Sequence, residues 1–149
     1  MQRLYLEDLA VGQRFESRRE LVDPEAIKAF AREFDPQPFH LDEEGAKLSL
    51  FGGLSASGWH TAALTMRLIV ESVPLQGGVI GLGGELSWPR PTRAGDTLRV
   101  VTEVLSITPS KSKPERGTII MRSTTLNQND EPVQIFAPTV VVQRRLAGS

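Results

Sequence analysis

The spacing of hydrophobic residues changes part-way along the chain, near residue 78. Before this point, apolar residues in one segment stand at i, i+3, i+4 and i+7: Ile27, Phe30, Ala31 and Phe34. This spacing predicts an amphipathic helix over residues 24–34, with Asp23 as its N-cap. Pro36 ends the helix, because the residue before a proline is pushed out of the helical region. A short strand is expected before the helix, over residues 12–22.

A second helix is predicted over residues 59–73. Its hydrophobic residues cover nearly every side: Trp59, Ala62, Ala63, Leu64, Met66, Leu68, Ile69 and Val70. A helix that is apolar all round is typical of a buried position. Between the two helices, the two prolines in residues 35–40 indicate a constrained, extended loop, and residues 42–47 indicate one more short helix.

Strand-type runs follow the second helix, and turn sequences separate the last three from what precedes them. They cover residues 79–88, 96–107, 117–126 and 133–144. A helical half followed by a strand-rich half predicts an α+β fold. We expect an antiparallel sheet wrapped round one long buried helix, with residues 1–149 forming a single domain.

Composition narrows the class of protein. The 149 residues include 17 basic and 18 acidic side chains, and this balance argues against a nucleic-acid partner. With no cysteine, the chain has no disulfide, thiolate zinc site, iron–sulfur cluster or cysteine nucleophile. The longest apolar run, near residues 61–70, is too short to span a bilayer. We therefore expect a cytoplasmic protein with no membrane partner.

Three features close together in the sequence are candidates for chemistry: Asp35, His40 and Gly58. Each alone has an ordinary structural explanation, as a turn residue, a packed histidine and a close-packing glycine. Together, a carboxylate and an imidazole held by the intervening prolines form a proton-transfer pair that can activate water. A backbone N–H at the start of a helix can stabilise negative charge on an oxygen. This combination fits hydration of an activated enoyl carbonyl, or hydrolysis of an ester or thioester.

Three segments resemble one family. Residues 35–42 read DPQPFHLD, residues 51–58 read FGGLSASG, and residues 90–98 read RPTRAGDTL. They are similar to the MaoC-like dehydratases, the (R)-specific enoyl-CoA hydratases with a hot-dog fold. The resemblance implies that Asp35 and His40 are the catalytic acid/base pair that holds the water, and that Gly58 is the oxyanion donor.

The same resemblance implies a substrate and an assembly. The expected ligand is an acyl-CoA thioester, with no metal and no redox cofactor, and the expected assembly is a homodimer or a dimer of dimers. Gln37 stands where the family usually has asparagine, and Ser57 where it often has histidine. We expect these two residues, with Trp59 and Arg93, to bind the substrate.

Other interpretations of the residues stay open. The same fold could act as an acyl-CoA thioesterase, or the chain could be a non-catalytic acyl-CoA-binding subunit. His60 fits a structural residue better than a second base. A set of cations fits either CoA phosphates or solvated turns: Arg93, Lys111, Lys113 and Arg116. The acids after His40 fit a solvated helical turn better than a metal site, and the glycines of residues 77–84 do not form a nucleotide cradle.

Overall fold

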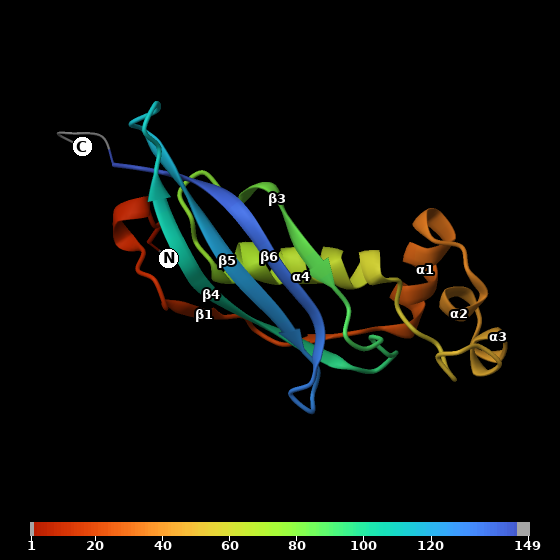
Figure 1. Ribbon diagram of the computed structural model, residues 1–149. Helices are drawn as coiled ribbons and strands as arrows, with labels where there is room; N and C mark the ends of the chain where they lie inside the picture. The colour runs from red at the N-terminus through yellow and green to blue at the C-terminus, as the bar shows by residue number, and fades with distance from the viewer. Residues whose placement is uncertain (1, 146–149) are drawn as a thin grey trace.

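The computed structural model describes residues 2–145. Its elements run in the order η1 (Leu6–Asp8), β1 (Arg14–Glu16), β2 (Glu20–Leu21), α1 (Pro24–Phe34), α2 (Pro38–Leu41), α3 (Glu43–Lys47), α4 (Gly58–Ser72), β3 (Ile80–Ser87), β4 (Thr97–Pro109), β5 (Arg116–Leu126) and β6 (Pro132–Gln143). Figure 1 shows α4 lying across one face of a strongly curved sheet, with α1, α2 and α3 grouped beyond its N-terminal end.

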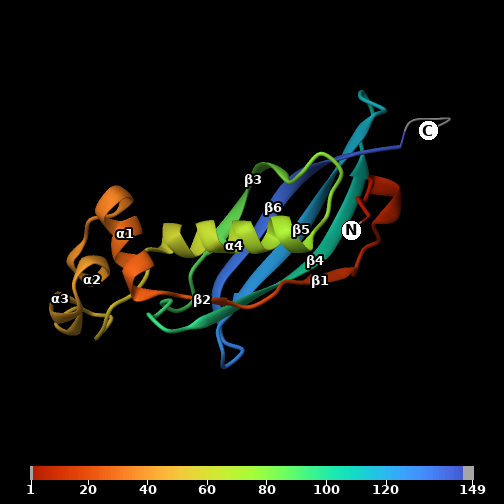
Figure 2. The same cartoon turned by 180° about the vertical axis from the view of Figure 1, so that it is seen from behind.

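The strands pair antiparallel in the order β1-β4-β5-β6-β3, and β2 pairs with the first two residues of β4. Alternate residues of β5 are buried, so one face of the strand, including Ile119 and Met121, contributes to the core. Leu68 and Ile69 of α4 belong to the same fully buried cluster. The view from behind in Figure 2 shows the helix resting in the concave side of the sheet. The predicted α+β arrangement, a sheet wrapped round one helix, is confirmed.

A second buried cluster joins the small helices to the end of the sheet where β4 and β6 begin. Ile27 of α1 and Ala46 of α3 are fully buried in it, together with Leu98 of β4 and Val133 of β6. Asp23 caps α1 as predicted, accepting a hydrogen bond from the Glu25 N–H at 3.0 Å. Phe39 of α2 and Leu64 of α4 pack against this cluster, which thus joins the small helices to α4.

Three details differ from the sequence-based expectation. The predicted strand over residues 12–22 is two short strands, β1 and β2, that pair with different parts of β4. Residues 35–40 are not wholly extended, because α2 begins at Pro38, whose fixed φ suits the first turn of a helix. Trp59 and Val70 of α4 are 61% and 48% exposed, because the sheet covers only one side of that helix.

Within residues 2–145, none of the helices has the length and apolar character that a membrane crossing requires.

Candidate active site

Asp35 and His40 come from two neighbouring short elements. Asp35 is the C-cap of α1, and His40 lies on α2, so the bend between these helices turns the two side chains toward each other. His40 Nε2 lies 3.4 Å from Asp35 Oδ2. His40 Nδ1 lies 2.6 Å from the Ser55 carbonyl oxygen, which can only accept a hydrogen bond. Nδ1 therefore carries a hydrogen, and Nε2 is the nitrogen available for proton exchange beside Asp35.

Both oxygens of the Asp35 carboxylate receive hydrogen bonds. Gln37 Nε2 donates to Oδ1 at 2.5 Å, and the Ser57 hydroxyl donates to Oδ2 at 2.7 Å. Burial opposes ionisation of Asp35, but the bonds from Ser57 and Gln37 and the charge of His40 outweigh it, so the pKa of Asp35 is lowered. Asp35 is thus a carboxylate at neutral pH. Ser57 and Gln37, the two positions where the sequence departs from the family pattern, both act on this one group.

The N-terminus of α4 supplies the third predicted group. Ser57 is the N-cap, fully buried, and its hydroxyl oxygen also accepts from the Trp59 N–H at 3.2 Å. Gly58 is the first residue of the helix, and its N–H has no acceptor among residues 2–145. A Cβ at position 58 would lie 2.7–2.9 Å from ring atoms of Trp88, so no side chain fits while the indole stays in place. A free N–H donor at the positive end of a helix can oppose developing negative charge.

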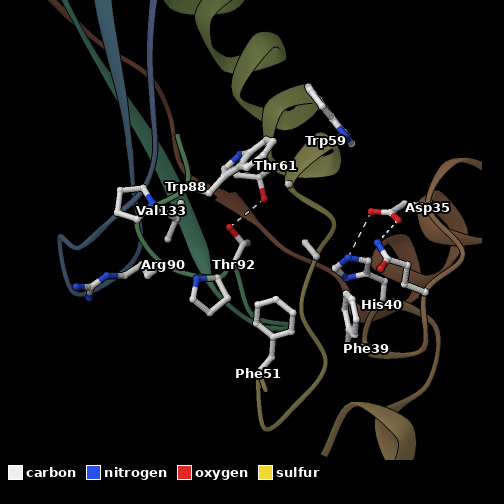
Figure 3. Close-up of a pocket in the computed structure, with 15 residues that line it drawn as sticks. Asp35, Phe39, His40, Phe51, Trp59, Thr61, Trp88, Arg90, Thr92 and Val133 are labelled. Carbon is white, nitrogen blue, oxygen red and sulfur yellow. Dashed lines mark hydrogen bonds and ion pairs between the residues drawn. The ribbon is translucent and has the colours of Figure 1, made fainter. Parts of the chain in front are cut away.

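These three groups line one pocket of about 440 Å³. Figure 3 shows Asp35 and His40 on one side of it and Trp88, Thr92 and Val133 on the other, with Phe51 below. The walls are mostly apolar, with Asp35 and His40 on one side and Arg90 and Thr92 on the other. A pocket of this composition is suited to an apolar ligand whose reacting end is polar.

The other predicted substrate-binding residues divide between the pocket and its surroundings. Gln37 and Trp59 line the pocket, whereas Ser57 is buried behind Asp35. Arg93 does not line it, because its guanidinium lies 3.3 Å from the Gly53 carbonyl and 3.4 Å from the Ser55 hydroxyl. Its predicted contact with substrate stays a prediction.

Several lining residues were not predicted. Arg90 lines the pocket and pairs with Glu131, although the sequence signal of its segment pointed to Arg93. Phe39, Phe51 and Trp88 form apolar walls. Phe39 and Phe51 lie inside the segments that carry the resemblance, but they were not assigned this role.

The remaining candidates lie elsewhere in the fold. His60 does not line the pocket but stacks on Phe30 at a ring separation of 4.9 Å. Burial, with a smaller effect of Arg67, lowers the pKa of His60, as expected of a packed, neutral residue. Lys111 and Arg116 lie at the β4–β5 end of the sheet, on the opposite side of the molecule from α1 to α3 (Figure 1). Both interpretations of these residues, a contact with CoA phosphates and a solvated turn, stay open.

The family follows from comparison with known proteins. The model of a family described as the MaoC like domain matches residues 8–125. This chain belongs to the MaoC-like family. The MaoC-like dehydratase of Rhodospirillum rubrum is 65% identical, with a TM-score of 0.94 over 96% of this chain and 99% of that one. The unliganded R-hydratase PhaJ1 of Pseudomonas aeruginosa is 28% identical, with a TM-score of 0.77 over 96% and 88%.

One curated relative is named as an enzyme. The 3-hydroxybutyryl-CoA dehydratase of Methylorubrum extorquens is 30% identical over 110 residues, covering 74% of this MaoC-like chain and 69% of that protein. The family model and the two structures confirm the predicted family resemblance and the predicted hot-dog fold.

Proposed function

We propose that this MaoC-like protein adds water to a trans-2-enoyl-CoA to give a (R)-3-hydroxyacyl-CoA, and catalyses the reverse dehydration. The observation that carries the proposal is the meeting of Asp35, His40 and the free Gly58 N–H in one largely apolar pocket. The names of the hydratase and dehydratase relatives support the reaction class and the stereochemistry.

In the proposed reaction each group has its own step. The water contacts both the Asp35 carboxylate and His40 Nε2, and its oxygen forms the new bond to C3 of the substrate. One water proton passes to the Asp35–His40 pair, and the pair returns a proton to C2, so the sum is the addition of H and OH. The Gly58 N–H donates to the thioester oxygen while negative charge builds there as an enolate. Ser57 and Gln37 keep Asp35 ionised and fix its orientation.

We propose that the working form is a homodimer joined through β3. This strand ends the sheet, and its outer edge pairs with no strand of residues 2–145. Ile80 and Leu82 on it are 52% and 65% exposed, and an open apolar edge invites pairing with a second copy. Light scattering after size exclusion is expected to give a dimer, and Leu82→Glu a monomer. A monomeric wild type would contradict the assembly.

The reaction is tested by following the conjugated enoyl-thioester absorbance of trans-2-enoyl-CoAs, with thiol release measured in parallel. Hydration predicts loss of absorbance and formation of the (R)-3-hydroxyacyl product without free thiol. Thiol release from saturated acyl-CoA without hydration would indicate a thioesterase. Tight acyl-CoA binding with neither reaction would indicate a non-catalytic subunit.

A further inference from the structure

A second pocket, of about 240 Å³, lies beside the first and takes no part in the mechanism above. It is formed by Ala62, Met66 and Ile69 of α4, Leu86 of β3, and Gln134 and Phe136 of β6. Its lining is almost entirely apolar. The volume is about eight times the ~30 Å³ that a water molecule occupies in the liquid, so several methylene groups would fit.

Trp59 lines both pockets, so the two are neighbours along the N-terminal turns of α4. Trp88 stands beside it, with the two rings edge-on at 5.3 Å between centroids and 86° between planes. The indole of Trp88 lines the catalytic pocket, while its Nε1 reaches Gln134, a residue of the second pocket. Trp88 therefore lines the catalytic pocket and is bonded to a residue that lines the second one.

The Trp88 ring is held in this position by three contacts. One edge packs directly on Gly58, as the distances to a Cβ at that position show. A second contact is the edge-on pair with Trp59. The third is a hydrogen bond of 2.9 Å from Nε1 to the side-chain oxygen of Gln134, which is 1% exposed.

A glutamine at position 134 is unusual for an apolar pocket. A buried amide in an apolar lining is unfavourable unless it is hydrogen-bonded, and an aliphatic residue would pack there without that requirement. Its Oε1 accepts from Trp88, so the amide and the indole keep each other in place. Turning the indole away would leave a buried acceptor without its partner, which resists movement of the ring.

We propose that Trp88, fixed by Gln134, closes the catalytic pocket against the apolar pocket and so restricts the protein to short acyl chains. This inference rests on the proposed function, because it takes an acyl thioester as the ligand. The acyl group of a short substrate ends in the catalytic pocket, against the indole. A longer chain meets the indole and is excluded from the apolar space behind it.

The test is equilibrium binding of saturated butyryl-CoA and octanoyl-CoA, measured by calorimetry, so that it does not depend on turnover. For the wild type, octanoyl-CoA is expected to bind no better than butyryl-CoA. Trp88→Ala joins the two pockets, and the preference for octanoyl-CoA over butyryl-CoA is expected to rise at least about tenfold, the scale of added methylene groups in an apolar pocket. Gln134→Met frees the ring at constant volume and is expected to shift the preference in the same direction, by less.

Met66→Ala is the matched control, because it enlarges the apolar pocket but leaves the indole in place. It is expected to keep the wild-type preference. A wild type that already favours octanoyl-CoA about tenfold, or Trp88→Ala and Gln134→Met variants that fold and keep the wild-type preference, would overturn the barrier. Inactivity of the wild type on every enoyl-CoA, with the binding shift observed, would overturn the proposed reaction and leave the barrier standing. Binding of neither acyl-CoA to the wild type would overturn both.

Discussion

Removing the Ser57 hydroxyl is the change that alters the protonation of the proposed base, Asp35, with the least disturbance of the pocket. Ser57→Ala removes one donor from Asp35 Oδ2 and leaves Gln37 on the other oxygen. The serine is fully buried, and alanine has nearly its shape, so the pocket keeps its form. The variant therefore isolates the effect of one hydrogen bond on the protonation of Asp35.

The size of the effect follows from the chemistry of that bond. A hydrogen bond to a charged group contributes about 1.5–3 kcal/mol. Ser57→Ala is therefore expected to stabilise the ionised form of Asp35 less by this amount, and so to raise the pKa of Asp35. Since Ser57 also caps α4 through a long contact to the Trp59 N–H, we expect a loss of about 0.5–1 kcal/mol in unfolding free energy.

The assay is the pH dependence of kcat/KM, with the carboxyl titration of Asp35 followed by NMR. Hydration requires ionised Asp35, so activity falls as pH drops through its pKa, and the acidic limb of Ser57→Ala is expected to move to higher pH. Ser55→Ala is the control, because that buried hydroxyl contacts the Gly53 carbonyl and Arg93, and the Ser55 carbonyl that holds His40 is retained. An acidic limb and a titration that do not move in Ser57→Ala would refute the role given to this serine.

Two further predictions concern residues around the site. Gly58→Ala keeps the N–H but places a Cβ against Trp88, so we expect it to lower both the melting temperature and the rate of hydration. The double variant Gly58→Ala/Trp88→Ala is expected to be more stable than the sum of the two single changes. Strictly additive melting temperatures would show that the indole is not the cause. Because the pKa of buried His60 is lowered, the unfolded chain takes up its proton first, and stability is lost as pH falls below the ordinary histidine value near 6.5. His60→Phe is expected to flatten urea-derived stability between about pH 5 and 7; an unchanged slope would contradict this.

The parts of the fold that sequence predicts well are those fixed by local rules. The spacing of apolar residues and the Asp23 cap place α1 correctly, and alternation with turn residues places the long strands to within a few residues. The strand over residues 12–22 was wrong in detail because its division depends on where β4 can pair. The short helix α2 was missed because a proline can begin a helix as well as interrupt one.

The site shows the same division between local and distant causes. Asp35, His40 and Gly58 were found from a short motif, and the structure brings them to one pocket. Trp88 was not found, because its partner Gln134 lies 46 residues away in the sequence. Such a pairing depends on the register of β3 against β6, which no local pattern specifies.

The most direct test of the central claim is the hydration of crotonyl-CoA by purified wild-type protein, compared with Asp35→Asn. We expect loss of the enoyl-thioester absorbance and formation of (R)-3-hydroxybutyryl-CoA with the wild type. Asp35→Asn is expected to fold and to be slower by at least about two orders of magnitude, the scale of a positioned acid–base group. Equal turnover by the two proteins would contradict the account of Asp35, and an inactive but folded wild type would contradict the proposed reaction itself.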